Sequence, residues 1–295
     1  MRIAAIDIGS NAIRFRVVDV FETKSGAVFR SLENVRFPLR LGTEVFTNSF
    51  ISPETEDKFI KLIQAYRVLI DLYEVEHYLA YATSAMREAE NGEALAKKCG
   101  KICDMDITLI DGKKESAVLS MAIEEFLGES CYIHVDVGGG STEINLYKNK
   151  ANVDSRSFTI GAVRGLGKGL DKETLFNEMG EWISSTLGEC VQVPVAIGTG
   201  GNINALMEHS GNDNLKFLSL EDLISTRDKI NQLDVLQRVR VLNMPKDRAD
   251  VIVPGADIYI KAMQKAGAES IIAPGTGLID GIIREAYIQH TEQGV

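Results

Sequence analysis

The most constraining feature of the sequence is a glycine-rich turn between two apolar runs, at residues 131–147 (CYIHVDVGGGSTEINLY). Apolar residues alternate with others before the turn, at Ile133, Val135 and Val137, and a second apolar run follows it. This pattern predicts a β-hairpin. Glycine loses more conformational freedom on ordering than any other residue, so a tip built from Gly138–Gly140 indicates a purpose beyond reversing the chain.

Phosphate binding is one such purpose. A glycine backbone can approach a ligand closely, several N–H groups can point at one anion, and Ser141 and Thr142 add hydroxyl donors. Asp136, which directly precedes the turn, could hold a divalent cation, Mg²⁺ or another, against the phosphate oxygens. The alternative is a loose hairpin whose aspartate bonds only its own turn, and this stretch by itself leaves that alternative open.

The same pattern occurs at the N-terminus, where residues 6–11 (IDIGSN) lead into a new apolar run from Ile13 to Val18. An apolar residue, an aspartate, an apolar residue and a glycine therefore occur in this order twice. Such a repeat predicts two related halves, each with one phosphate-binding hairpin. Gly9, Ser10 and Asn11 would bind phosphate in the first half, and Asp7 is a second candidate metal ligand.

With both loops in view, the chain resembles the actin and sugar-kinase ATPase superfamily. Within it, the chain resembles the exopolyphosphatase and guanosine pentaphosphate phosphohydrolase family. The segments that carry this resemblance are residues 5–11, 81–91, 112–121, 135–143, 161–165, 197–202 and 247–255. The resemblance implies an α/β fold of two actin-like (ribonuclease H-like) lobes with a cleft between them. The first lobe would be residues 1–121, completed by a C-terminal helix at about 279–295, and the second would be 122–278.

Length and charge agree with this expectation. A chain of 295 residues suits two domains. The net charge of −10 opposes a nucleic-acid-binding surface, which needs a basic stripe. It leaves a phosphate substrate open, because salt screens the general repulsion beyond about 8 Å.

No apolar run reaches the roughly 20 residues of a membrane span and no signal peptide is visible, so we expect no membrane association and a cytoplasmic location. The four cysteines show no zinc spacing and are expected to be free thiols.

The resemblance also implies catalytic residues. It places the family's catalytic glutamate at Glu115, where a general base would activate a water molecule. It places a phosphate-facing arginine at Arg87, whose planar fork can bond two oxygens. Glu143, beside the glycine-rich turn, is a further acidic candidate. A helix-dipole role for Glu115 and a surface position for Arg87 are the structural alternatives. The family usually has arginines where this chain has Ala117 and Ile279, so two expected cations are missing.

A third glycine-rich loop, residues 198–202 (GTGGN), follows an apolar strand and corresponds to the superfamily's nucleotide-side loop. Thr199, Gly200 and Gly201 are its candidate phosphate-binding residues. The loop lacks the lysine of a P-loop, which excludes that class of NTPase. Arg164, in another matching segment, is either a substrate contact or an interdomain partner, and the sequence does not decide between these roles.

The resemblance implies an exopolyphosphatase-type phosphohydrolase that uses Mg²⁺ to release terminal orthophosphate from inorganic polyphosphate, from guanosine pentaphosphate, or from both. Two other functions remain. One is a non-catalytic sensor of polyphosphate or of guanosine penta- or tetraphosphate, and the other is an ATP-dependent small-molecule kinase of the same superfamily. No base-recognition element is identifiable, so the choice of substrate stays open. A homodimer also stays open.

Overall fold

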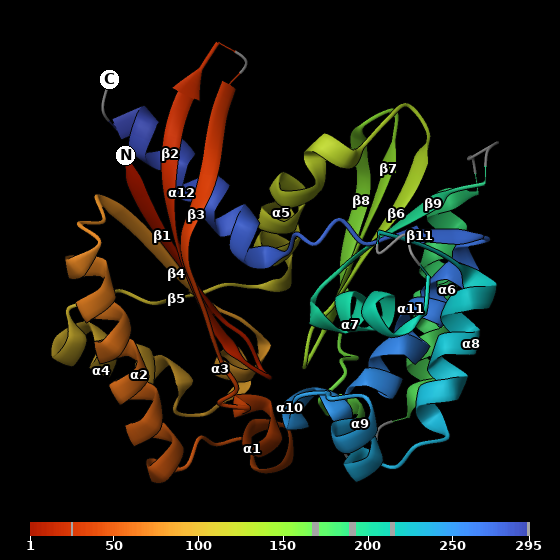
Figure 1. Ribbon diagram of the computed structural model, residues 1–295, viewed down its shortest axis with the longest axis horizontal. Helices are drawn as coiled ribbons and strands as arrows, with labels where there is room; N and C mark the ends of the chain where they lie inside the picture. The colour runs from red at the N-terminus through yellow and green to blue at the C-terminus, as the bar shows by residue number, and fades with distance from the viewer. Residues whose placement is uncertain (25, 167–170, 189–192, 213–215, 294–295) are drawn as a thin grey trace. The chain divides into compact units, whose positions relative to one another are not determined.

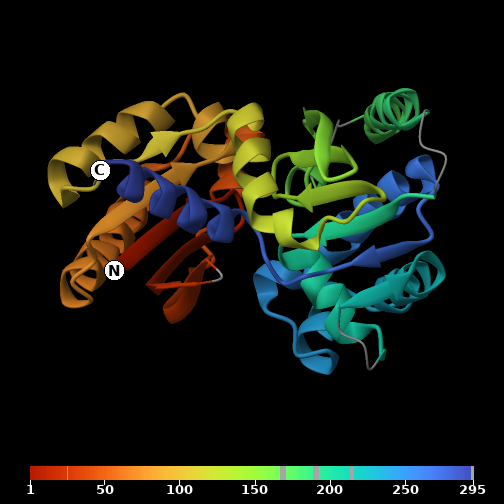
Figure 2. The ribbon, with the colours of Figure 1, turned by 90° about the horizontal axis from the view of Figure 1, so that it is seen from above.

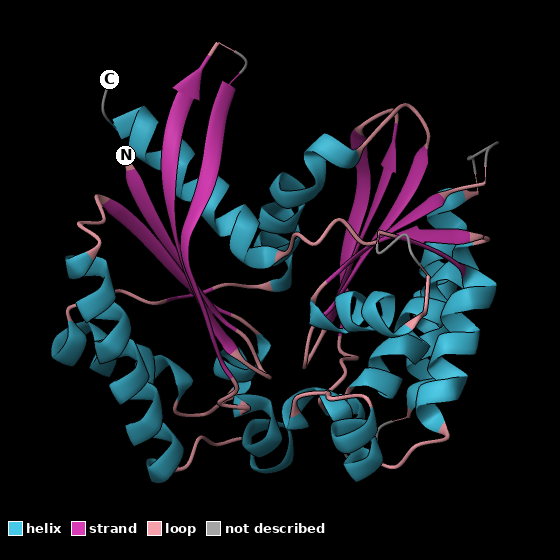
Figure 3. Ribbon diagram, viewed as in Figure 1, coloured by secondary structure: helices cyan, strands magenta, loops and turns pink. Residues whose placement is uncertain are grey.

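The computed structural model of the chain describes residues 1–24, 26–166, 171–188, 193–212 and 216–293. They form two compact units, one made of Met1–Ala122 with Leu278–Val295 and the other of Ile123–Gly277. Each unit has one mixed β-sheet with helices packed against it (Figures 1 and 3). The predicted α/β class is confirmed.

The first unit is built on a five-stranded sheet in the order β3-β2-β1-β4-β5. Strands β1, β2 and β3 pair antiparallel, whereas β4 pairs parallel with β1 and β5 pairs parallel with β4. The elements are β1 (Arg2–Ile8), β2 (Ile13–Thr23), β3 (Gly26–Phe37), α1 (Leu41–Asn48), α2 (Pro53–Leu72), β4 (His77–Ala82), α3 (Ser84–Glu88), α4 (Gly92–Cys103), β5 (Thr108–Leu109), α5 (Gly112–Ile123) and α12 (Leu278–Gln293).

Both faces of this sheet are covered, which explains why β1 is apolar at nearly every position. Ile6 belongs to a core cluster with Phe59 of α2 on one face. Ala5 belongs to a second cluster with Ile282 of α12 on the other face. Helix α12 runs along the strands (Figure 2) and packs on β1, β2 and β4. Since side chains alternate along a strand, Asp7 points to the face that α5 and α12 cover.

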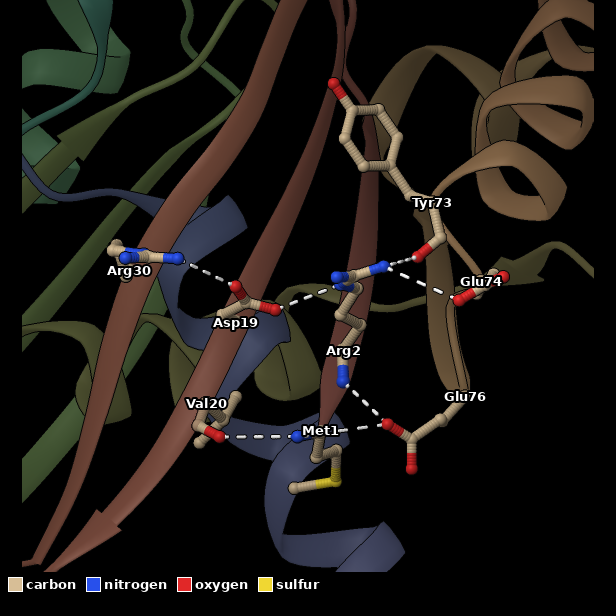
Figure 4. Close-up of polar contacts among 8 residues, drawn as sticks. All are labelled: Met1, Arg2, Asp19, Val20, Arg30, Tyr73, Glu74 and Glu76. Atoms are coloured by element: carbon tan, nitrogen blue, oxygen red, sulfur yellow. Dashed lines mark hydrogen bonds and ion pairs between the residues drawn. The ribbon is translucent and has the colours of Figure 1, made fainter.

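The start of β1 is fixed by a group of charged residues (Figure 4). Arg2 donates from Nε to Asp19 of β2 at 3.0 Å and from Nη1 to the carbonyl of Tyr73 at 2.8 Å. Its backbone N–H donates to the Glu76 carboxylate at 2.9 Å. Arg30 of β3 donates to the other oxygen of Asp19 at 3.1 Å. These contacts join the three antiparallel strands to the segment that follows α2.

The second unit is built on a six-stranded sheet in the order β10-β11-β9-β6-β7-β8. Helix α11 packs against α6, α7 and α8 and against β6. The elements are η1 (Glu124–Phe126), β6 (Cys131–Val137), β7 (Thr142–Lys148), β8 (Ala151–Phe158), η2 (Arg164–Leu166), α6 (Lys172–Leu187), β9 (Val195–Thr199), α7 (Gly201–His209), β10 (Phe217–Ser219), α8 (Leu220–Asn231), α9 (Val235–Val241), α10 (Lys246–Ala249), α11 (Ile252–Ala266) and β11 (Ser270–Ile272).

The two sheets repeat one arrangement. In the second unit, β6, β7 and β8 pair antiparallel, β9 pairs parallel with β6, and β11 pairs parallel with β9. The series β8-β7-β6-β9-β11 therefore matches β3-β2-β1-β4-β5 strand for strand, and β10 is added at the edge. The repeat in the sequence thus corresponds to a repeat in the topology.

The cysteines differ from the expectation. Cys99 and Cys103 are buried free thiols in α4, and burial raises the pKa of Cys99 to about 12. Cys131, at the start of β6, is disulfide-bonded, so the prediction of a free thiol there is wrong. Cys190 lies outside the described residues. Within the described part of the chain, every helix is too short or too polar to cross a membrane.

Candidate phosphate-binding and catalytic site

The first predicted loop is the tip of the β1–β2 hairpin. Ile8 and Ile13 are the last paired residues, so residues 9–12 form the turn. The N–H of Gly9 donates to the carbonyl of Ala12 at 3.2 Å. A Cβ on Gly9 would lie only 3.0 Å from that oxygen, which makes glycine the residue that fits this turn best. Gly42 and Arg40 donate to the carbonyls of Ser10 and Asn11 at 2.8 and 3.1 Å.

Asp7 has a cationic partner that sequence reasoning missed. Arg14 is its register partner on β2 and donates to Asp7 Oδ2 at 2.7 Å. Asp7 is only 3% exposed, so this pairing occurs with little solvent around the carboxylate. The four-residue turn itself places residue 14 opposite residue 7, and counting outward from the turn would have revealed the pair. A positive charge thus already neutralises the carboxylate that the sequence predicted as a metal ligand.

The second predicted loop has the same geometry in the β6–β7 hairpin. Val137 and Thr142 are the last paired residues, and the N–H of Gly138 donates to the carbonyl of Ser141 at 3.0 Å. A Cβ on Gly138 would again lie 3.0 Å from the accepting oxygen. Gly9 and Gly138 therefore close equivalent four-residue turns, and their own N–H groups are used in doing so.

The segment 161–164 holds the carbonyl groups of the glycine-rich turn. Ala162 donates to the Gly138 carbonyl at 3.0 Å, Val163 and Arg164 donate to that of Gly139 at 2.9 Å, and Arg164 Nε donates to that of Gly140 at 2.7 Å. Arg164 thus contacts the turn itself. Among the described residues, nothing accepts a hydrogen bond from the N–H groups of Gly139 and Gly140. An anion could therefore bind to them.

Asp136 lies on one face of the sheet with side chains of β7 and β9. Its register partners are Glu143 on β7 and Thr199 on β9, and Asn145 is the register partner of His134. The Thr199 hydroxyl donates to Asp136 Oδ1. His134 Nε2 lies 2.9 Å from the Thr199 hydroxyl, and Asn145 Nδ2 lies 3.1 Å from His134 Nδ1. Burial lowers the pKa of His134 to about 3, so the ring is neutral.

Glu143 is fully buried, and its Oε1 accepts a hydrogen bond from the Ser157 hydroxyl at 2.8 Å. Register partners in an antiparallel pair have Cβ atoms about 4.5–5.5 Å apart, so Glu143 and Asp136 present two carboxylates side by side. Such oxygen ligands fit Mg²⁺, which binds through one or two carboxylates and takes its other ligands from water and phosphate. Within the described residues, no three acidic, histidine or cysteine side chains are grouped to hold a metal alone.

Glu115 and Arg87, the predicted base and its cation, are neighbours in the first unit. Glu115 lies in the first turn of α5, is 5% exposed, and has Oε2 3.8 Å from Nη1 of Arg87. The same Nη1 donates to the carbonyl of Ile110 at 2.5 Å, which fixes the guanidinium beside the carboxylate. The two side chains are therefore held beside each other, with the carboxylate buried.

The third loop has more structural constraints than the sequence suggested. Gly200 has φ +97°, and a Cβ there would lie 3.2 Å from the Val137 carbonyl. A Cβ on Gly201 would lie 2.2 Å from the Arg248 guanidinium, which is bonded to Asn202. The Thr199 hydroxyl donates its hydrogen bond to Asp136 Oδ1. The Thr142 hydroxyl donates to the Ile160 carbonyl at 2.6 Å. The structure thus gives the hydroxyls of Thr142 and Thr199 protein partners rather than leaving them for phosphate.

The two positions where the family usually has arginine, 117 and 279, lie in different environments. Ala117 is exposed on α5. Ile279 is 4% exposed and belongs to the core cluster that includes Ile282 of α12 and Val118 of α5. Its neighbour Asp280 forms an ion pair with Arg16. An arginine could thus be added at position 117 without loss of packing but not at position 279.

The chain is similar to known proteins over nearly its whole length. It is 26% identical to a bifunctional 3-dehydroquinate synthase/phosphatase of Fusobacterium nucleatum over 96% of this chain but 46% of that protein, so it spans just under half of that relative. It is 24% identical to exopolyphosphatase 1 of Mycobacterium tuberculosis, over 96% of this chain and 87% of the relative.

Solved structures show the same fold. A crystal structure of an exopolyphosphatase from Cytophaga hutchinsonii superposes with a TM-score of 0.81 at 22% identity, covering 100% of this chain and 99% of the other. The Aquifex aeolicus member of the Ppx/GppA family superposes with a TM-score of 0.77 at 23% identity, covering 98% of each chain. A model of the Ppx/GppA phosphatase family matches residues 19–290. The chain therefore belongs to the Ppx/GppA phosphatase family.

Proposed function

We propose that this protein hydrolyses the terminal phosphoanhydride bond of inorganic polyphosphate or guanosine pentaphosphate and releases orthophosphate. The observation that carries the proposal is the repeated hairpin. Two equivalent four-residue turns each follow a buried aspartate by one residue, in a chain that belongs to a phosphatase family. The exopolyphosphatases among its relatives support polyphosphate as the substrate class.

Each group of residues has a proposed role. Glu115 orients a water molecule in line with the terminal phosphorus and takes its proton as the new P–O bond forms and the bridging P–O bond breaks. Arg87, beside Glu115, stabilises the charge that develops on the phosphoryl oxygens. Backbone N–H groups of each turn would bind phosphate oxygens, at Ser10 and Asn11 in the first unit and at Gly139 and Gly140 in the second.

Asp136 and Glu143 are the residues that would hold Mg²⁺. The bound ion would neutralise phosphate oxygens and so lower the barrier to attack by water. Asp7 was an alternative ligand in the sequence, but its ion pair with Arg14 favours the carboxylates of the second unit for this role.

Phosphate release by the purified protein with Mg²⁺, measured on polyphosphate and guanosine pentaphosphate in parallel, tests the proposal. We expect Glu115→Gln to lower release by about a thousandfold while substrate binding persists, because the amide cannot take a proton. Glu124→Gln, which alters an exposed glutamate just beyond α5, is the matched control and should retain wild-type release. Full activity of Glu115→Gln would contradict the assignment of the base.

A sensor function is the second candidate, and Ala117 and Ile279 are the observation that favours it. With alanine and isoleucine where the family usually has arginines, the first unit has fewer cations to stabilise a transferring phosphoryl group. A sensor would bind polyphosphate or guanosine penta- or tetraphosphate with Mg²⁺ but release no orthophosphate. The same assay, combined with a binding measurement, separates the two functions.

A further inference from the structure

A chain of buried polar side chains lies behind Asp136 and crosses three strands. It runs from Asn145 on β7 through His134 on β6 to Thr199 on β9, and ends at Asp136 on β6. Asn145, His134 and Thr199 are fully buried, and Asp136 is 8% exposed. Burying this many polar groups costs free energy unless each is hydrogen-bonded, so the chain requires a reason.

The direction of each hydrogen bond in this series of side chains follows from Asp136, the residue at its end. An ionised carboxylate can only accept, so the Thr199 hydroxyl gives its single proton to Asp136 Oδ1. The hydroxyl oxygen must then accept from His134, which puts the imidazole proton on Nε2. His134 Nδ1 faces the Asn145 amide nitrogen, which is a donor, so Nδ1 is the accepting nitrogen of the ring. One proton lies at each link, and all donate toward the carboxylate.

We propose that His134 is a positioning residue, which acts through Thr199 to fix the orientation of the Asp136 carboxylate. The proposal rests on the function proposed above, in which Asp136 holds Mg²⁺. The hydrogen bond from Thr199 to Oδ1 limits how the Asp136 carboxylate can rotate. Asn145 in turn fixes which ring nitrogen of His134 carries the proton. Residues that orient a ligand in this way typically change metal affinity by about 10- to 100-fold when they are replaced.

The alternative is that His134 only fills space and satisfies Asn145 in the core. Two substitutions separate these roles, because glutamine and asparagine place their amides at different distances along the side chain. In His134→Gln, the longer side chain would carry a donor near the position of Nε2 and could still reach Thr199. In His134→Asn, the shorter side chain would place its amide near the position of Nδ1 and could satisfy Asn145 alone. If His134 acts through Thr199, His134→Gln restores function and His134→Asn does not.

The first measurement is Mg²⁺ binding to the whole protein without substrate, by isothermal titration calorimetry. We expect Thr199→Val and His134→Asn to raise the Kd for Mg²⁺ by about tenfold or more, whereas Thr199→Ser and His134→Gln stay within about threefold of the wild type. A loss that is equal in His134→Gln and His134→Asn, or absent in both, would overturn the proposal. Thermal unfolding of each variant identifies any that fails to fold, and Thr199→Val and Thr199→Ser then supply the comparison.

The second measurement does not depend on metal or activity. ¹⁵N NMR of the histidine ring reports which nitrogen carries the proton, and the proposal requires the Nε2–H form. An Nδ1–H form would overturn it, whatever the activity of the protein. If the wild type binds Mg²⁺ but releases no phosphate, the proposed hydrolase fails while the positioning role of His134 is still supported by Mg²⁺ affinity and ring protonation. If the wild type hydrolyses polyphosphate and His134→Asn has the same Kd for Mg²⁺ and the same kcat, only the positioning role fails.

Discussion

Gly161 supports the glycine-rich turn, and its replacement by alanine is the sharpest structural test of the site. A Cβ at position 161 would lie 2.5 Å from the Gly139 carbonyl oxygen and 2.6 Å from backbone carbons of Gly139 and Gly140. Because these are backbone atoms, no change of side-chain rotamer can relieve the contact. Either the turn or the segment 161–164 must shift.

The magnitude follows from what that shift would break. Four hydrogen bonds join the segment to the turn, from Ala162, Val163 and Arg164 N–H and from Arg164 Nε. Each contributes about 1 kcal/mol net, and overpacking a filled site costs about 1–3 kcal/mol. Partial loss of the hydrogen bonds together with this strain gives a destabilisation of about 3 kcal/mol. For a unit of this size, that lowers the Tm by about 6–12 °C.

Gly165→Ala is the matched control, because a Cβ there meets its nearest atom at 3.6 Å, an ordinary contact with Pro254. Differential scanning calorimetry and phosphate release should be measured on both variants. We expect Gly161→Ala to lower both Tm and phosphate release and Gly165→Ala to change neither. If Gly161→Ala unfolds within about 2 °C of the wild type, or if both variants lose the same stability, the turn is not held by this segment as described.

The remaining predictions concern the missing arginines and the acid stability of the first unit. Ala117→Arg should keep the wild-type Tm and raise phosphate release, because it adds an exposed cation near the site. Ile279→Arg should lose about 3–5 kcal/mol of unfolding free energy in urea titrations, since it buries a charge; equal stability of the two variants would contradict the assigned environments. Burial tends to raise the pKa of Asp19, but hydrogen bonds from Arg2 and Arg30 outweigh it and lower this pKa below its ordinary 3.8. Its contribution to stability is therefore present above that pH and lost as pH falls through the folded pKa, so Asp19→Asn should show a smaller fall in Tm from about pH 5 to about pH 2.

Local sequence patterns predicted the parts of the site that depend on local structure. Alternation and glycine placement identified both hairpins, and the apolar-Asp-apolar-Gly pattern identified the repeat. Glu115 and Arg87 are brought together in the first unit, although the sequence could not show that the Ile110 carbonyl would fix the guanidinium.

The register of distant strands could not be predicted. No role for His134 was visible in the sequence, because its partners lie on other strands and Thr199 is sixty-five residues away. Parallel pairing of β6 with β9 brings Thr199 beside Asp136, and no local propensity encodes which residues of two parallel strands are neighbours. The same limitation applies to Thr142, whose hydroxyl donates to the carbonyl of Ile160, eighteen residues further along the chain.

The two hairpins also differ in the sign of the charge opposite each aspartate. Arg14 faces Asp7, whereas Glu143 faces Asp136, although both pairs occupy the same place beside equivalent turns. The first pair joins an arginine to a carboxylate, whereas the second places two acidic side chains opposite each other. In the proposed mechanism, a divalent ion therefore gains far more by binding at the second hairpin. We therefore expect the protein to bind one metal ion per chain, at the second hairpin.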